Sequence, residues 1–224
     1  MLGLEVFRGR KGGLVVVDIR VTNTKNRIQQ GLLKCMEEKP FREIYSRDVI
    51  KKAEISSRTF YHYYSNKNEV LDDTENELVS GLKKAMKKDR AQVKRMNHLA
   101  TSEEVIQNFE ESYKTTIDFY IINKSMILTL LSENGDISFL KKIYKITEEE
   151  IFTRIKLVYG SDKKIKPNHV LSFNIALNNY VNSIINSISY LLQFDDKLSP
   201  HQIRHIVGKV EVDSPVQLLQ DQFE

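Results

Sequence analysis

The sequence contains very little cysteine, proline and glycine, and it has no tryptophan. Its 224 residues include one Cys, four Pro and nine Gly. The single cysteine, Cys35, excludes an internal disulfide and any metal site built from several cysteines, and it indicates a reducing compartment. Because Gly and Pro punctuate loop-rich β-sandwiches, their scarcity favours long helices instead.

Long apolar runs are absent as well. No stretch approaches the roughly 18 residues that cross a membrane, and the apolar run at residues 14–17 is too short for the core of a signal peptide. With 41% apolar and 29% charged residues, the composition is typical of a globular chain and excludes a disordered one. We therefore expect a cytoplasmic protein without a membrane partner.

Positive charge is concentrated in the N-terminal third of the chain. Residues 1–67 hold 14 Lys and Arg against seven Asp and Glu, a balance of +7. The remaining 157 residues hold 20 against 23, a balance of −3. This asymmetry favours a head that binds a polyanion, attached to a separate regulatory body.

Residues 1–23 differ from the rest and are expected to be an N-terminal extension. The apolar run at 14–17 is strand-like but has no partner run nearby, and residues 8–11 are basic. Three interpretations stay open: a flexible basic arm that touches DNA, a strand that adds to another molecule, or a stretch that precedes the true start of the protein. The regular fold is expected to begin at Thr24, a suitable helix N-cap.

Helical periodicity continues from there to the C-terminal region, which predicts an all-α fold. In the first helix one stripe is expected to be buried: Ile28, Leu32, Cys35 and Met36. Two short helices follow at 47–53 and 57–64, with Ser46 and Ser56 as their caps and a tight turn at residues 54–55, which is the helix-turn-helix unit. Longer helices are predicted over residues 67–94, 102–123, 137–159 and 170–194 and from Pro200 onward.

The third helix carries an exposed face whose chemistry suits a DNA groove. At 100° per residue, Ser57, Arg58, Tyr61 and His62 share an arc of about 140°, while Phe60 points towards the core. An Arg pairs with guanine through two hydrogen bonds, hydroxyl groups reach base edges or phosphates, and aromatic rings pack on thymine methyl groups.

Two further basic residues flank this helix. Arg47 opens the preceding helix, close to the same edge of the groove, and Lys67 stands near the start of the next helix. The charge of Lys67 and the helix N-terminus together favour a phosphate.

The segment 46–71 resembles the DNA-binding domain of TetR-type transcriptional regulators. The family pattern S-R-x-T-[LF]-Y-x-[HY]-[FY]-x-x-K corresponds here to Ser56, Ser57-Arg58-Thr59-Phe60-Tyr61-His62-Tyr63-Tyr64 and Lys67, and residues 47–53 resemble the second helix of the family. The specific match covers residues 24–71. Glu54 departs from the pattern, since the family usually has Gly in this turn, and a non-Gly residue in a left-handed conformation costs about 1 kcal/mol.

The resemblance implies a division of labour among these residues. The residues expected at base edges are Arg47, Ser57, Arg58, Tyr61 and His62. The residues expected at phosphates are Ser46, Thr59, Tyr63 and Lys67. It also implies a helix-turn-helix DNA-binding domain at 24–71 and a helical ligand-binding and dimerisation domain at 72–224.

For the body, the resemblance implies a cavity for an unknown small effector and a homodimer interface in the C-terminal helices. The candidate pocket residues are Phe109, Tyr113, Tyr120, Met126, Leu130, Phe173 and Leu177. Two apolar stripes fit either a dimer interface or the core of the chain: Tyr180, Ile184, Ile188 and Leu191, and Ile203, Ile206, Val207 and Val210. The expected function is a ligand-responsive regulator, in most cases a repressor, which binds a palindromic site in double-stranded DNA as a homodimer.

An enzyme and a protein-interaction module are the alternatives. The chain has no Gly-rich phosphate loop, no nucleophile elbow and no evident metal-ligand set, so neither catalysis nor a cofactor is expected. His201 and His205 lie one turn apart but read as a surface pair, and the run Glu148-Glu149-Glu150 reads as solvated helix surface. A helical module that docks on another regulator, without an operator of its own, remains open because of Glu54 and the unusual extension.

Overall fold

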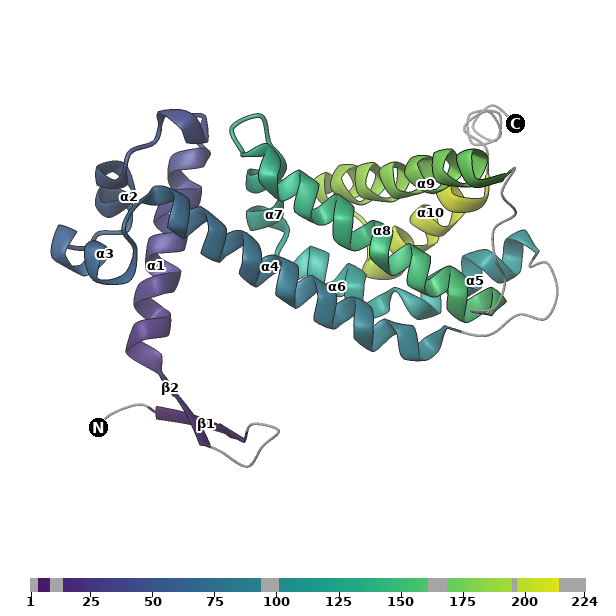
Figure 1. The fold of residues 1–224 in the computed structure, drawn as a ribbon, viewed down its shortest axis with the longest axis horizontal. Helices are drawn as coiled ribbons and strands as arrows, with labels where there is room; N and C mark the ends of the chain where they lie inside the picture. Colours follow the sequence, from purple (N-terminus) through teal and green to yellow (C-terminus); the bar gives the residue numbers. More distant parts are fainter. Residues whose placement is uncertain (1–3, 9–13, 94–100, 161–168, 195–196, 214–224) are drawn as a thin grey trace. The chain divides into compact units, whose positions relative to one another are not determined.

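The computed structural model describes residues 4–8, 14–93, 101–160, 169–194 and 197–213, and within them the fold is all-α after a two-stranded hairpin (Figure 1). The expected fold class is confirmed. The helices are α1 (Ile19–Met36), α2 (Ser46–Lys52), α3 (Ser57–Tyr63), α4 (Lys67–Asp89), α5 (Ser102–Ser112), α6 (Lys114–Ile122), α7 (Lys124–Leu131), α8 (Ile137–Tyr159), α9 (Val170–Leu191) and α10 (Pro200–Val212). Short 3-10 turns occur at Phe41–Glu43, Arg90–Gln92 and Leu192–Phe194.

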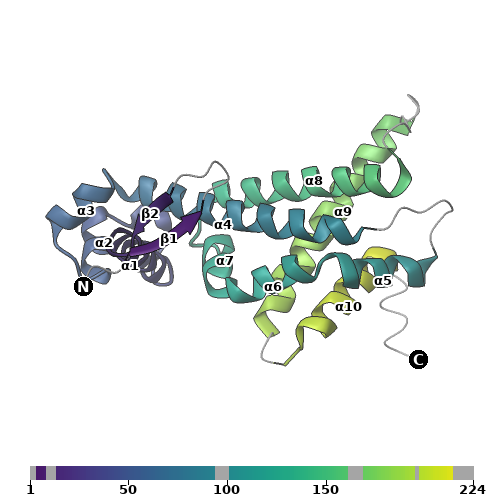
Figure 2. The ribbon, with the colours of Figure 1, turned by 90° about the horizontal axis from the view of Figure 1, so that it is seen from below.

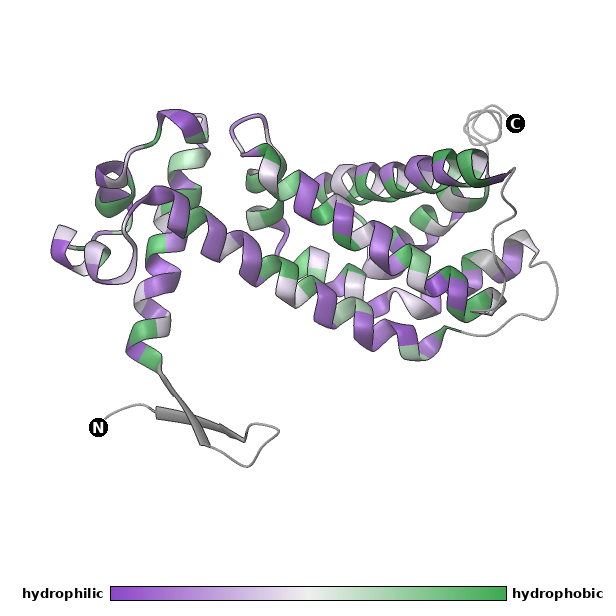
Figure 3. Cartoon of the chain, in the orientation of Figure 1, coloured by the Kyte–Doolittle hydropathy of each residue, from purple (hydrophilic) through white to green (hydrophobic). Residues whose placement is uncertain are grey.

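The chain divides into two compact units. Unit 1 comprises Met1–Glu77 and Thr129–Asp136, and unit 2 comprises Leu78–Leu128 and Ile137–Glu224. Hydrophobic and hydrophilic segments alternate along the helices of both units, as expected of amphipathic elements (Figure 3). No helix among the described residues is both long and apolar enough to span a membrane.

The N-terminal extension contradicts one expectation, because its apolar run does have a partner. Strand β1 (Leu4–Arg8) pairs antiparallel with strand β2 (Leu14–Asp18), so that Leu4 lies opposite Asp18 and Arg8 opposite Leu14. Strand β1 does not form a continuous apolar run, because Glu5 separates Leu4 from Val6 and Phe7.

Helix α1 begins earlier than predicted, and Thr24 is not its cap. The helix starts at Ile19, directly after β2, and the Thr24 hydroxyl donates to the Arg20 carbonyl oxygen at 2.8 Å, as it does inside a helix. The predicted buried stripe is confirmed, since Ile28, Leu32 and Met36 are fully buried and Cys35 is 2% exposed. Burial raises the pKa of the Cys35 thiol.

Unit 1 holds α3 in place through its last residues. The ring of Tyr64 is buried, and its hydroxyl donates to Oδ2 of Asp73 at 2.6 Å, an atom that also accepts from Nζ of Lys25 at 3.0 Å. Burial and this hydrogen bond raise the pKa of the Tyr64 phenol. The exit of α3 is thereby fixed to both α1 and α4.

Unit 2 contains a helix break that the sequence did not predict. Instead of one helix over 102–123, the chain forms α5 and α6, with Tyr113 between them at φ −123° and ψ 13°. The cause lies in Asp89, the last residue of α4. Its buried carboxylate accepts from the backbone N–H groups of Thr115 at 3.0 Å and Thr116 at 2.7 Å, which caps the start of α6. Helix α4 also ends before the predicted residue 94, which lies outside the described residues.

The other predicted helix ends agree with the structure. Helix α8 covers 137–159 and stops at Gly160, whose φ of 92° is left-handed. Ser199 caps α10 by accepting from the Gln202 backbone N–H, with Pro200 at the first position. Helix α9 ends at Leu191, and a 3-10 turn continues it to the predicted Phe194.

Figure 2 shows α4 and α8 side by side, where Nζ of Lys83 lies 3.9 Å from Oε2 of Glu149.

Candidate DNA-binding site

The turn between α2 and α3 is held by an Arg side chain of α1 and by the cap of α3. Glu54 adopts a φ of 53°, the left-handed conformation expected of the residue that replaces the usual Gly. The guanidinium of Arg27 in α1 donates to the carbonyl oxygens of Ala53 at 3.0 Å and Glu54 at 2.8 Å. The predicted cap of α3 is confirmed, because Ser56 Oγ accepts from the Thr59 backbone N–H at 3.0 Å.

Helix α3 buries one residue and exposes its predicted face. Phe60 is fully buried, whereas Ser57, Arg58, Tyr61 and His62 are exposed, Tyr61 by 59%. A helix of seven residues has little stability of its own, so its position depends on this anchor.

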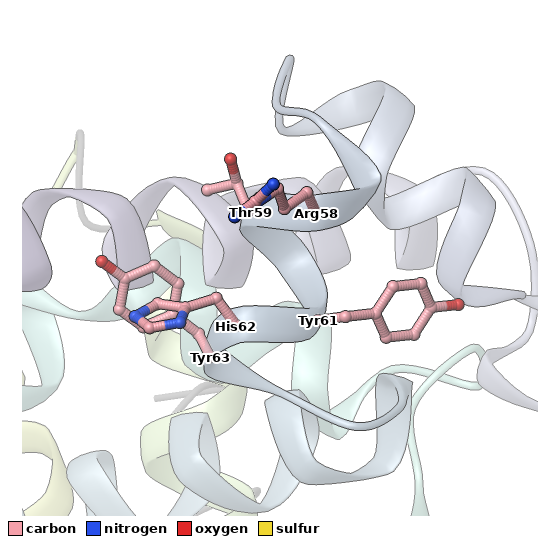
Figure 4. Close-up of a pocket in the computed structure, with 5 residues that line it drawn as sticks. All are labelled: Arg58, Thr59, Tyr61, His62 and Tyr63. Atoms are coloured by element: carbon pink, nitrogen blue, oxygen red, sulfur yellow. The ribbon is translucent and has the colours of Figure 1, made fainter.

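The exposed side chains point in more than one direction. Arg58, Thr59, Tyr61, His62 and Tyr63 line an open pocket on the surface of unit 1, and Tyr61 points away from His62 and Tyr63 (Figure 4). The rings of His62 and Tyr63 meet edge to face, with centroids 4.8 Å apart. Thr59 is half-buried, and its hydroxyl lies 2.8 Å from Ser56 Oγ, so it belongs to the cap.

The start of α2 differs from the prediction by one residue. Ser46 is the first residue of the helix rather than its cap, and it is half-buried. The capping position is Tyr45, whose backbone N–H donates to Asp48 Oδ2 at 2.9 Å, while Nζ of Lys39 donates to the same oxygen at 2.8 Å. These two hydrogen bonds, that of Lys39 above all, lower the pKa of the Asp48 carboxyl.

Sequence reasoning missed Tyr45, which is 59% exposed beside Arg47. The guanidinium of Arg47 is itself exposed and lies over the Tyr45 ring, 5.0 Å from the centroid. The sequence carries no clear signal for Tyr45, because Ser46 is the better capping residue by type and the capping position of Tyr45 is seen only in the structure.

Lys67, at the first position of α4, is already engaged within unit 1. Its Nζ donates to the carbonyl oxygens of Phe41 at 2.6 Å and Arg42 at 3.3 Å and lies over the Phe41 ring. Burial, with a contribution from the charge of Lys39, lowers the pKa of the Lys67 ammonium.

The candidate pocket residues fall in different places. Leu130 is buried in unit 1, whereas the other six belong to unit 2, so the structure does not gather all seven in one unit. Phe109 and Tyr120 are buried, and Met126 and Leu177 are half-buried.

Two of these aromatic residues stack on each other. The rings of Phe109 and Tyr113 are stacked at 4.2 Å, and the guanidinium of Arg154 lies 3.8 Å from the centroid of the Tyr113 ring. Phe173 contacts Phe152 instead, at 6.4 Å between centroids. Phe109 and Tyr113 are thus the pair that the structure brings together.

The two histidines of α10 face a carboxylate. Nδ1 of His205 lies 2.7 Å from Oε1 of Glu110, and Nε2 of His201 lies 3.7 Å from Oε2 of the same residue. In the described part of the chain, no group of three His, Cys, Asp or Glu side chains is arranged to hold a metal ion.

The interpretation of residues 148–150 as solvated surface is wrong for Glu150. This residue is 3% exposed and accepts hydrogen bonds from Nε of Arg90 at 2.8 Å and Nε of Arg154 at 2.8 Å. Glu148 and Glu149 are exposed as expected. Glu150 is buried because two guanidinium groups compensate its charge.

Comparison with known proteins gives the same family as the resemblance of residues 46–71 does. Residues 30–74 match the model of the bacterial regulatory proteins of the tetR family. The crystal structure of a TetR transcriptional regulator from Streptococcus agalactiae 2603V is similar over 88% of this chain and 97% of its own, with 19% identity and a TM-score of 0.53. That of a putative TetR-family transcriptional regulator from Syntrophomonas wolfei is similar over 85% and 94%, with 15% identity and a TM-score of 0.56.

At these identities the likeness to the solved structures concerns the fold, while the family model covers the helix-turn-helix segment itself. No curated protein sequence matches the chain. Regulators of this family are transcription factors rather than enzymes, as the sequence predicts. Residues 30–74 thus match the tetR family of bacterial regulatory proteins, and the fold of the described chain is that of the solved TetR regulators.

Proposed function

We propose that the chain is a repressor that binds a palindromic operator as a homodimer and leaves it when a small effector binds. The observation that carries this proposal is the exposed face of α3, where Ser57, Arg58, Tyr61 and His62 meet solvent around a buried Phe60. These side chains supply a guanidinium, two hydroxyl groups and an imidazole, which match the donors and acceptors of the major groove.

The flanking residues fit contacts with the sugar-phosphate backbone. Ser46, the first residue of α2, and Tyr63, the last residue of α3, are half-buried, and Thr59 is part of the α3 cap. When DNA binds, the Lys67 ammonium would give up its hydrogen bonds to the carbonyl oxygens of Phe41 and Arg42 and donate to a phosphate instead. The positive charge of Lys67 favours the phosphate. Arg47 is exposed and reaches a base edge from the start of α2.

Selection of genomic DNA fragments by the purified protein tests this proposal. The wild-type chain is expected to enrich one palindrome, and Arg58→Ala to bind it more weakly by about 1–3 kcal/mol, the value of one good base contact. The control is Arg42→Ala, which removes an Arg side chain that is 84% exposed in the same unit. If the wild type enriches no sequence at any salt concentration, the proposal fails and the protein-interaction module becomes the better explanation.

The proposed dimer interface rests on exposed apolar residues of α9. Ile184, Ile188 and Leu191, expected as one possible surface, are instead buried within the chain. A different part of the same helix is exposed, with Leu171 at 74% and Ile175 at 54%. An apolar face of this kind suits a symmetric helix bundle formed by two copies.

The double variant Leu171→Glu/Ile175→Glu is expected to shift the chain from dimer to monomer, because four carboxylates would meet across a two-fold interface. Sedimentation analysis of the molecular mass measures this shift. Ile122→Glu is the matched control, since Ile122 in α6 is 81% exposed and should leave the dimer intact. A wild-type chain that is monomeric at every concentration would contradict the proposed interface.

The effector would act by binding the arrangement of the dimer that does not fit the operator. The six candidate pocket residues of unit 2 include the stacked pair Phe109 and Tyr113, which suits an apolar or aromatic ligand. A ligand that prefers one arrangement shifts the population towards it by its difference in affinity. The operator found by selection supplies the assay in which such ligands are screened.

A further inference from the structure

Tyr45 is exposed where nothing in the fold requires an aromatic residue. It precedes α2, and 59% of its surface is open to solvent, so it contributes little to the core of unit 1. Its backbone is extended, at φ −115° and ψ 157°, and is fixed by the hydrogen bond from its N–H to Asp48 Oδ2 at 2.9 Å. The main chain therefore fixes the place from which the Tyr45 side chain extends, and the exposed ring is available to a neighbouring side chain.

The partner of this ring is the guanidinium of Arg47, 5.0 Å from the ring centroid. Contact with an aromatic face orients a guanidinium while leaving its five N–H donors available. The alternative partner, Asp48, is committed to Lys39 and to the backbone of Tyr45. Within the described residues no carboxylate lies in salt-bridge distance of Arg47.

We propose that Tyr45 is a positioning residue for DNA recognition, which holds the Arg47 guanidinium ready for the edge of a guanine. The proposal rests on the proposed function, in which Arg47 reads a base. A free Arg side chain loses rotamer freedom when it binds, whereas Arg47 is already held in place by the Tyr45 ring. A base edge gains more from this than a phosphate does, because two parallel hydrogen bonds require a defined plane.

The affinity for the selected operator is measured for four variants: Tyr45→Phe, Tyr45→Leu, Arg47→Ala and the double variant Tyr45→Leu/Arg47→Ala. Together they distinguish the contribution of the Tyr45 ring from that of its hydroxyl group and from that of Arg47. Tyr45→Phe keeps the ring and should bind like the wild type. Tyr45→Leu should bind about two- to five-fold more weakly, the size of an exposed cation–π contact. In the Arg47→Ala background the same change should have no further effect.

The second readout is the base preference within the operator. If Tyr45 only stabilised unit 1, its replacement would leave this preference unchanged. Tyr45→Leu should relax the preference at the same base pair as Arg47→Ala, and the slope of affinity against salt should stay at its wild-type value. Arg42→Ala, the control for general loss of charge, should leave the preference unchanged.

Three results would overturn the proposal while the proposed function stands: a Tyr45→Leu effect that persists without Arg47, equal effects of Tyr45→Phe and Tyr45→Leu, or a uniform loss of affinity over all sequences. A readout without DNA is the NMR shift of the Arg47 Nε–H, which the ring current displaces in the wild type and in Tyr45→Phe but not in Tyr45→Leu. A wild type that selects no operator would overturn the proposed function, and this inference with it.

Discussion

Replacing Glu150 by alanine is expected to lower the free energy of unfolding of unit 2 by about 3–5 kcal/mol, because it leaves two guanidinium groups without their counter-charge. Glu150 is 3% exposed and Arg154 is 8% exposed, so water replaces the lost carboxylate poorly at Arg154, whereas Arg90 is 34% exposed and is hydrated more easily. Nε of Arg90 donates to both carboxylate oxygens, at 3.1 and 2.8 Å.

The consequences of this change extend beyond the ion pairs. Arg154 also donates to Ser112 Oγ at 3.0 Å and to the Ser112 carbonyl oxygen at 2.9 Å, next to the break between α5 and α6. The same guanidinium lies over the ring of Tyr113. Loss of Glu150 therefore loosens the group that holds a candidate pocket residue in place.

Denaturant unfolding of the full chain, followed by circular dichroism, measures the loss. Glu149→Ala is the control on the same helix turn, since Glu149 is 54% exposed and its pairing with Lys83 at 3.9 Å contributes at most about 1 kcal/mol. Glu150→Gln keeps the shape of the side chain and one acceptor oxygen, so its free energy of unfolding should lie between those of Glu150→Ala and Glu149→Ala. Equal stabilities for Glu150→Ala and Glu149→Ala would show that the buried cluster contributes no net stability.

The features that local sequence could predict are those set by residues within one or two helical turns. The stripe of Ile28, Leu32 and Met36, the Ser56 cap and the Ser199-Pro200 helix start follow from spacing and capping chemistry, and the structure agrees with each. The exposed face of α3 belongs to the same class, because its geometry follows from 100° per residue.

The features that escaped prediction depend on partners far away in the chain. The break at Tyr113 needs Asp89, which lies 26 residues before the N–H group of Thr115 that it caps. The burial of Glu150 needs Arg90, which is 60 residues away. Neither partner can be identified from periodicity, since a charged residue on a helix looks solvated until the helix that covers it is known.

The candidate DNA-binding site shows the same limit at shorter range. Arg47 was identified from its position, but its contact with Tyr45 depends on the side-chain conformations of two exposed residues. The hydrogen bonds of Lys67 to the carbonyl oxygens of Phe41 and Arg42 depend on how the chain turns at 41–43. Residue type predicts the candidate DNA-binding groups, whereas the fold determines which contacts these groups make within the chain.

Replacing Phe60 by alanine is expected to destabilise unit 1 by about 3–5 kcal/mol, because it removes the one fully buried side chain of α3. The ring also contacts that of Tyr64, with centroids 6.3 Å apart, so the anchor at the end of the helix loses a neighbour. A helix of seven residues cannot keep its conformation without this packing. Operator binding should therefore be lost together with the local structure.

Tyr61→Ala, at the next position, separates folding from recognition. Tyr61 is 59% exposed but packs edge to face on the Phe60 ring, with centroids 5.3 Å apart. Its removal should therefore lower the free energy of unfolding by no more than about 1.5 kcal/mol, well below the effect of Phe60→Ala, and should still weaken operator binding. Hydrogen exchange at the Tyr64 amide, which donates to the Phe60 carbonyl at 3.0 Å, reports on α3 directly. Phe60→Ala should lose this protection and Tyr61→Ala should keep it. The opposite result would be that both variants keep the protection of the Tyr64 amide and both lose operator binding. Phe60 would then affect recognition without stabilising α3, which contradicts the structural role inferred from its burial.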